Sequence, residues 1–403
     1  MSAHAATPAA RRGGVYATPA GRALAIAVAA LLAATLLGLV LLWPAGGEDG
    51  GRAPAGLLAE TLPATVVSTD LVPCGPVDQE CLRATAELDG GQRATLTLGP
   101  VGTRDVGAGD EIRLQRNPLP EGVEPGPGFE PYTFVDFDRR APMLVLAIAF
   151  AVAAVLLARW RGALALLGIV LSVGLVVAFL VPAISDGASP VLASLVGALA
   201  VMFVTLGLTY GASPQAAAAA LGIGLSLLLA TLLGELLTSV AHLDGASSDL
   251  AGQLRADEPG LSLRGIVVAS MVVGALGVLA DTAVSQVSTV MALRRANPRQ
   301  APAQLYREAF VVGRDHLAAT IHTLVLAYVG AALPLLLIIE ASDAGLVAAI
   351  TSQELAEPVV ATLVGALALI VAVPLSTLLA AHLLHRVPVS ALPEDGHAHA
   401  HAH

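Results

Sequence analysis

The sequence contains no lysine, and aromatic residues make up only 3% of its 403 residues. Charged residues amount to 13%, and the formal net charge is -10. A protein that binds nucleic acid needs a basic stripe, usually with interleaved aromatic side chains, to contact the phosphates and bases. The composition therefore excludes a nucleic-acid partner.

Sequence motifs for the commonest reactions are missing as well. The chain has no Walker motif for binding a nucleotide, no HExxH zinc motif and no GxSxG nucleophile motif. Its two cysteines, Cys74 and Cys81, are too far apart for a CxxC redox or metal motif. We therefore expect no resident cofactor and no enzymatic activity, and an intramembrane enzyme is the weakest of the hypotheses considered.

Long hydrophobic runs dominate what is present. Hydrophobic residues make up 56% of the chain and its mean hydropathy is +0.76. Since about 20 apolar residues cross a bilayer as a helix, the sequence predicts a mainly α-helical, polytopic membrane bundle of about eight helices. The expected spans are 22–43, 142–158, 162–182, 190–210, 214–240, 265–292, 317–339 and 359–385.

Arginines near the ends of these spans predict the orientation. Eleven fall in segments that are cytoplasmic if the N-terminus is inside, against five in the exterior segments. We therefore expect both termini in the cytoplasm and a multi-pass protein of the bacterial plasma membrane. The expected parts are a tail (1–21), a signal anchor rather than a cleaved signal peptide (22–43), an exterior domain (44–140), a seven-helix domain (141–386) and a second tail (387–403).

The exterior segment 44–140 alternates polar and apolar residues, with glycine, aspartate and proline turns between the runs. This pattern predicts a small β-barrel-like domain of about five strands. In an oxidising compartment Cys74 and Cys81 are expected to form a disulfide, and two unpaired surface thiols are the alternative. Such a domain is a candidate site for an extracytoplasmic protein partner.

The C-terminal tail alternates histidine with alanine at His397, His399, His401 and His403. Alternating imidazoles can bind zinc, nickel, copper or cobalt, so weak metal binding is one hypothesis for this tail. A flexible end without other ligands is the simpler interpretation.

The expected span 265–292 carries a carboxylate, which is costly in a bilayer. Asp281 belongs to a line of small and polar residues spaced three or four apart, so the line follows one stripe of a helix. We expect this stripe to face other helices, with Asp281 near the midplane. The stripe comprises Ser270, Gly274, Gly277, Asp281, Ser285 and Ser288, bordered by Thr282 and Thr289.

Two interpretations of Asp281 stay open. In the first, it binds a proton or cation on a transport path, with Ser285 and Ser288 as neutral ligands. In the second, it ties helices together. The next span offers possible partners: His322 and Thr323 lie inside it, and we expect Arg314 and Asp315 to form a pair at its cytoplasmic end. His322 could exchange protons with Asp281, because imidazole ordinarily changes charge near neutral pH.

Three stretches resemble the YibE/F family of bacterial membrane proteins: GALGVLADTAVSQVSTVMAL, GRDHLAATIHTLVLAYVGAALPLLL and PVVATLVGALALIVAVPLSTLLAA. The resemblance implies a multi-pass membrane protein and no particular reaction. Residues at recurrent family positions are Asp281, Ser285, Gly313, Arg314, Asp315 and Pro334. The family usually has asparagine where this chain has His322, which weakens the proton-exchange hypothesis for that histidine.

Two functions remain after these exclusions. The first is a proton- or ion-coupled secondary transporter for a small ion or solute, with Asp281 as the coupling group. The second is a non-catalytic membrane scaffold or signalling component, in which the exterior domain binds a partner and the bundle acts as an anchor.

Overall fold

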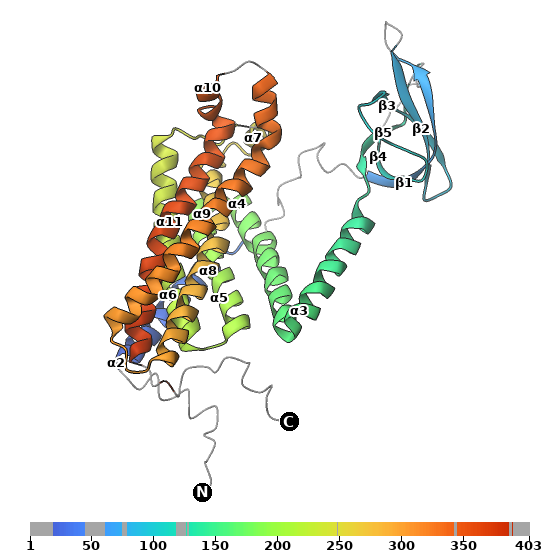
Figure 1. The fold of residues 1–403 in the computed structure, drawn as a ribbon. Helices are drawn as coiled ribbons and strands as arrows, with labels where there is room; N and C mark the ends of the chain where they lie inside the picture. The colour runs from blue at the N-terminus through green and yellow to red at the C-terminus, as the bar shows by residue number, and fades with distance from the viewer. Residues whose placement is uncertain are drawn as a thin grey trace, which may run out of the picture. The chain divides into compact units, whose positions relative to one another are not determined.

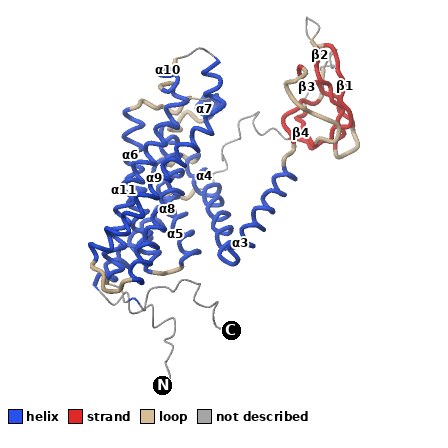
Figure 2. The backbone as a smooth tube through the Cα atoms, in the orientation of Figure 1, coloured by secondary structure: helices blue, strands red, loops and turns tan. Residues whose placement is uncertain are grey.

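The computed structural model describes residues 19–44, 61–74, 79–117, 126, 129–247, 249–341, 345–386 and 389. The chain forms two compact units, one of residues 1–50 and 160–403 and one of residues 51–159. The first unit is a helical bundle and the second contains a β-sheet (Figures 1 and 2). The second unit ends at residue 159, and the expected exterior domain over 44–140 stays a prediction.

Helix α8 is at the centre of the bundle and contacts four long helices, α5, α6, α9 and α11. Figure 1 shows these helices side by side, and α2 packs on α5 and α6. The long helices are α2 (Pro19–Leu41), α5 (Pro190–Tyr210), α6 (Pro214–Val240), α8 (Leu263–Ala296), α9 (Pro302–Ala341) and α11 (Gln353–His385). Shorter helices are α4 (Val181–Ser185), α7 (Asp249–Asp257) and α10 (Leu346–Ile350).

Helix α3 (Arg140–Leu175) combines two of the runs expected as separate spans. Its backbone is non-helical at Arg159, where φ is 53° and ψ is -131°, a conformation that residues with a β-carbon rarely adopt. A π-helical segment, η1 (Val176–Leu180), then leads into α4. Seven of the described helices, counting residues 140–185 as one, are long and apolar enough to cross a membrane. The two runs expected as separate helices, 142–158 and 162–182, are thus joined at Arg159 without an intervening loop.

Helix α9 also differs from expectation. The sequence suggested a loop with a short helix at 304–312, followed by a separate span from residue 317. Instead α9 runs without interruption for 40 residues. Leu305, Ala309 and Gly313 form a buried stripe along its first half, so packing against neighbouring helices continues the helix through polar sequence.

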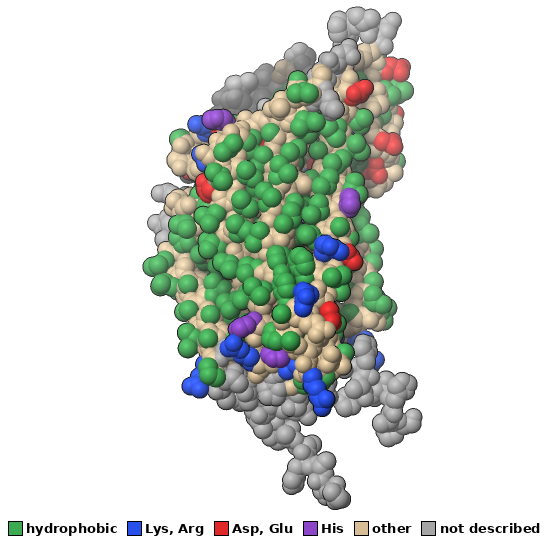
Figure 3. All heavy atoms as spheres, turned by 60° about the vertical axis from the view of Figure 1, so that its left-hand side comes forward, with side chains coloured by type: hydrophobic (Ala, Val, Ile, Leu, Met, Phe, Trp, Pro, Cys, Tyr) green, Lys and Arg blue, Asp and Glu red, His purple; other side chains and the backbone are tan. Residues whose placement is uncertain are grey.

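Apolar side chains cover most of the outer face of the bundle seen in Figure 3, and arginines and histidines gather at its lower end. The core consists of small and aliphatic residues of α5, α6, α8, α9 and α11. A bundle that is apolar both inside and outside is the expected arrangement for a protein surrounded by lipid.

The second unit contains a five-stranded antiparallel sheet with strand order β3-β2-β1-β4-β5. Its strands are β1 (Thr61–Pro73), β2 (Glu80–Leu88), β3 (Arg93–Pro100), β4 (Glu111–Arg116) and β5 (Tyr132–Phe137). Alternate residues of the strands face one core, which includes Val66, Ala84, Leu96, Ile112 and Leu114. The observed number agrees with the expected number of about five strands.

The two end strands of this sheet, β3 and β5, approach each other. The carboxylate of Glu130, just before β5, accepts hydrogen bonds from the backbone N–H of Thr97 at 3.0 and 3.1 Å and from its hydroxyl at 2.6 Å. The Glu130 side chain therefore links β3 to the segment before β5 and closes the curled sheet. The structure joins Cys74 and Cys81 in a disulfide at the β1–β2 end, with Cα atoms 5.6 Å apart.

Candidate functional site

The polar stripe of α8 faces outwards. Between residues 265 and 291 the exposed positions of this helix are Ser270, Gly274, Gly277 and Asp281. The Asp281 side chain is 74% exposed. Two of these exposed positions nevertheless border α9, because a β-carbon at Gly274 would lie 3.4 Å from the hydroxyl of Tyr328 and Asp281 approaches His316. Small residues fit either a close helix contact or an open groove, and aliphatic residues on the other side of α8 fill the core.

One imidazole, that of His316, lies close to the carboxylate of Asp281. Nε2 of His316, on α9, lies 3.6 Å from Oδ2 of Asp281. This distance allows an electrostatic contact but is too long for a hydrogen bond. His316 Nε2 is itself buried and has no hydrogen-bond partner among the described residues. The histidine next to Asp281 is therefore His316 and not the expected His322.

Two further polar side chains, Tyr210 and Arg161, lie near the ends of other helices in the same unit. Tyr210 is the last residue of α5 and is partly buried. Arg161 is exposed and lies in the second arm of α3, just after the break. The contact with His316 joins two helices, α8 and α9, at the carboxylate of Asp281.

The serines that follow Asp281 are engaged elsewhere. The Ser285 hydroxyl donates to the backbone carbonyl of Asp281 at 2.6 Å. The Ser288 hydroxyl accepts a hydrogen bond from Nε2 of Gln215, at the start of α6, at 2.7 Å. The second contact places the start of α6 beside Ser288 of α8.

The remaining residues expected on α9 do not meet Asp281 in the described structure. His322 and Thr323 are exposed, and the Thr323 hydroxyl donates to the carbonyl of Ala319. Arg314 and Asp315 are exposed too, but they do not mark a helix end, because α9 begins at Pro302. That expectation failed because it treated the polar first half of α9 as a loop.

The buried polar residues of α8 lie on the opposite side from the stripe. Thr282 and Gln286 are one turn apart and almost fully buried, as are Ser376 and Thr377 of α11. Thr377 Oγ1 lies 2.9 Å from Gln286 Oε1 and 2.6 Å from the carbonyl of Val373, so its single proton has two acceptors. Thr282 was expected at the border of the stripe, whereas Gln286 was not singled out.

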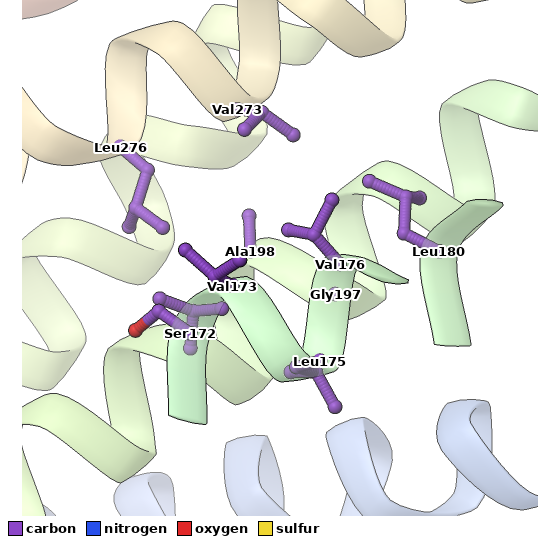
Figure 4. Close-up of a pocket in the computed structure, with 10 residues that line it drawn as sticks. Ser172, Val173, Leu175, Val176, Leu180, Gly197, Ala198, Val273 and Leu276 are labelled. Carbon is purple, nitrogen blue, oxygen red and sulfur yellow. The ribbon is translucent and has the colours of Figure 1, made fainter. Parts of the chain in front are cut away.

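A half-open cavity of about 210 Å³ lies between the second arm of α3, η1, α5 and α8 (Figure 4). Its lining is aliphatic except for Ser172, whose hydroxyl donates to the carbonyl of Gly168 at 2.7 Å. Val176 and Leu180 of the π-helical segment form part of the wall. Pro182, which has no N–H to donate, accounts for the irregular helix here.

No cluster of three or more metal-ligating side chains occurs among the residues that the structure describes. The four tail histidines, His397, His399, His401 and His403, lie outside those residues, and the hypothesis of metal binding by the tail stays a prediction.

Comparisons with known proteins place the chain in a family. No curated protein and no solved structure matches the chain. A sequence model described as YibE/F-like protein matches residues 146–386, which include α5, α6, α8, α9 and α11. Because the match covers more than half of the chain and seven helices have membrane-spanning length, this membrane protein belongs to the YibE/F-like family.

Proposed function

We propose that this protein is a proton-coupled secondary transporter of the bacterial plasma membrane, with Asp281 as the coupling group. The observation that carries the proposal is the contact between the Asp281 carboxylate and His316 on the open stripe of α8. A carboxylate and an imidazole can each bind and release a proton, and at 3.6 Å a charge on one favours the opposite charge on the other. An ionisable pair on an apolar bundle favours function over simple packing.

The contacts of Asp281 also favour a position near the inner surface of the bilayer, and not at the midplane. Helix α8 is about 51 Å long at 1.5 Å per residue, well beyond the roughly 30 Å of a hydrocarbon core. Leu263 is about 27 Å from Asp281 along the helix axis. The start of α6 lies beside Ser288, because Gln215 hydrogen-bonds to its hydroxyl. We infer that the last turns of α8 extend into the cytoplasm.

This placement gives the proton a route. A carboxylate at the boundary exchanges protons with cytoplasmic water, and the exposed small residues of the stripe, Ser270, Gly274 and Gly277, continue from it towards the other surface. A group that a conformational change exposes alternately to either side is the basic requirement of coupled transport.

The test is proton flux into proteoliposomes that contain the full chain and a pH-sensitive dye. We expect gradient-dependent flux in the wild type, its loss in Asp281→Asn and a marked decrease in His316→Gln. Glu308→Gln is the control, because Glu308 is an exposed carboxylate of α9 that hydrogen-bonds Gln304 and not Asp281. Wild-type flux in Asp281→Asn, with an unchanged melting temperature, would refute the proposal.

A scaffold is the second candidate, and one observation favours it. The β-unit exposes aliphatic side chains on β1 and on the turn after β3, namely Val67, Leu71 and Val101. Exposed apolar residues mark a protein-binding surface where they join into one patch. If cross-linking at Leu71 captures one defined exterior protein in cells and proton flux is absent, the scaffold replaces the transporter.

A further inference from the structure

Arg294, near the end of α8, holds two other parts of the chain together. Its guanidinium donates hydrogen bonds to the backbone carbonyl of Pro298, in the loop after α8, and to that of His385, the last residue of α11, the latter at 3.0 Å. Arg294 is only 8% exposed, and its Nε is buried without a hydrogen-bond partner among the described residues. One buried guanidinium therefore fixes the loop after α8 against the end of α11.

An exposed arginine follows each of the two carbonyls. Arg299 follows Pro298 and Arg386 follows His385, and both arginines are exposed. Because both carbonyls contact the guanidinium of Arg294, the chains of Arg299 and Arg386 begin at neighbouring points of the backbone. Two positive side chains that are far apart in the sequence are thus brought to one surface, which we call the Arg299–Arg386 surface.

Carboxylates that could neutralise this surface are missing from the adjoining sequence. No aspartate or glutamate occurs within residues 282–307 or within residues 358–393. None of the ion pairs formed by the described residues includes Arg294, Arg299 or Arg386. Figure 3 shows arginines and histidines at this lower end of the bundle. The surface therefore carries a net positive charge that attracts an anion.

The face of α11 that leads to Arg386 is apolar further into the helix. Between residues 371 and 386 the exposed positions are Val371, Leu378, His382 and Arg386. Intervals of seven, four and four residues keep these side chains on one face of the helix. This helix is long and apolar enough to cross a membrane. Its exposed face thus changes from apolar to basic at the helix end, as a lipid changes from acyl chain to head group.

We propose that the Arg299–Arg386 surface binds the phosphate of an anionic phospholipid, whose acyl chains lie along Val371 and Leu378. A guanidinium can donate two parallel hydrogen bonds to phosphate oxygens, so the two arginines can hold one phosphate between them. Clusters of basic residues at the end of a membrane helix are typical contacts of anionic head groups. Arg294 is a positioning residue, because it holds the backbone at both arginines.

The inference goes beyond the proposed function and does not depend on it. Arginines that only set the orientation of a helix in the membrane need no fixed arrangement. A buried arginine that joins two exposed ones in space is instead the arrangement expected of a binding site.

The experiment measures binding of single lipids to the full chain in a non-ionic detergent by native mass spectrometry. Dioleoyl phosphatidylglycerol, which has a net negative charge, is compared with dioleoyl phosphatidylcholine, which has the same acyl chains and no net charge. We expect the anionic lipid to bind about 25-fold more tightly, at about fivefold for each arginine. A large excess of inorganic phosphate should not displace it, because free phosphate has no acyl chains to contact α11.

Variants of the two exposed arginines test the site. Arg299→Gln and Arg386→Gln should each weaken binding of phosphatidylglycerol about fivefold, and the double variant should bind the two lipids alike. Arg255→Gln is the matched control, since Arg255 is an exposed arginine of α7, which precedes the opposite end of α8. Because all three arginines are exposed, the variants should keep the melting temperature of the wild type.

Equal affinity of the wild type for the two lipids, or an undiminished preference in the double variant, would overturn the inference. An equal loss in Arg255→Gln would also overturn it, because the attraction would then belong to arginines in general. Displacement of the lipid by inorganic phosphate would show that the ligand is a free anion and not a lipid. None of these results depends on proton flux, so the lipid site and the transport function are tested separately.

Discussion

Gly313 of α9 lies directly against the side-chain carboxamide of Gln286 of α8. A β-carbon at Gly313 would be 2.6 Å from Gln286 Oε1 and 2.7 Å from Nε2. Since the same Oε1 faces the hydroxyl of Thr377, the carboxamide joins three helices at one point. The close approach requires glycine on α9, because any side chain would displace the amide.

The first prediction follows from this contact. Gly313→Ala should lower the free energy of unfolding by about 1–2 kcal/mol, because the amide must move and weaken its contact with Thr377. The comparison is Gly330→Ala on the same helix, where no atom lies within 4 Å of the new methyl group. That variant should gain about 0.5–1 kcal/mol from helix propensity.

Thermal melting of both variants in one detergent provides the measurement. Equal effects of the two substitutions would show that Gly313 is not held by Gln286.

The second prediction concerns the hydrogen bond between Gln286 and Thr377. A double-mutant cycle with Gln286→Leu and Thr377→Val should give a coupling energy of about 0.5–1.5 kcal/mol, typical of side-chain hydrogen bonds between membrane helices. The value is modest because the Thr377 hydroxyl also has the carbonyl of Val373 as an acceptor.

Reversible unfolding of the four proteins gives the coupling energy. Ser226, a buried residue of α6 that donates to its own helix at Gly222, is the control partner for Gln286. A cycle of Gln286→Leu with Ser226→Ala should give a coupling energy near zero, and strictly additive effects for the Thr377 pair would contradict the prediction.

The third prediction addresses the closure of the β-sheet. Glu130→Ala should destabilise the β-unit by about 1–3 kcal/mol, because the backbone N–H of Thr97 loses its acceptor. Amide hydrogen exchange of the peptide containing Thr97 should become faster. Glu111→Ala on β4 is the control, since its side chain is exposed. Unchanged protection at Thr97 in the Glu130 variant would show that the sheet stays closed without this carboxylate.

The fourth prediction is a pH dependence. The backbone N–H of Ala246, followed by the side chain of Gln353, holds the pKa of Asp244 below its usual value. Asp244 lies in the loop after α6, and Gln353 begins α11. A carboxylate whose pKa is lower in the folded state stabilises above its unfolded pKa, roughly 4, and this contribution is lost as the pH falls through the folded value.

The measurement compares the melting temperatures of wild type and Asp244→Asn from about pH 7 to about pH 3. The difference should be constant above roughly pH 5 and should shrink below pH 4. A difference that grows towards acid would have the wrong sign and would exclude Asp244 as its source.

Hydrophobic runs predicted the helices well, because a span of 20 apolar residues has few alternatives to a helix in lipid. Two of the predicted helix boundaries differ from those in the structure, each for a physical reason. At Arg159 a single residue with positive φ replaced the expected loop. In α9, burial of Leu305 and Ala309 against other helices extended the helix through a segment whose apolar residues are too few to predict a membrane span.

The site was harder to predict. Spacing placed Asp281 on a stripe with Gly274 and Gly277, and the structure keeps that stripe together. Periodicity fixes which residues share a face, but it cannot tell which neighbour that face meets. His316 and Gln286 became recognisable only through contacts between helices, since one polar residue in a helix carries no signal about its partner.

The bond from Thr97 to Glu130 also has a consequence for the behaviour of many copies in one compartment. An end strand with a free row of N–H and C=O groups is a template on which another chain can add a strand. The carboxylate of Glu130 accepts the backbone N–H of Thr97, which would otherwise be free on the edge of β3, and places a negative charge there. The same carboxylate that closes the sheet therefore hinders a second chain from pairing with β3, which disfavours edge-to-edge aggregation.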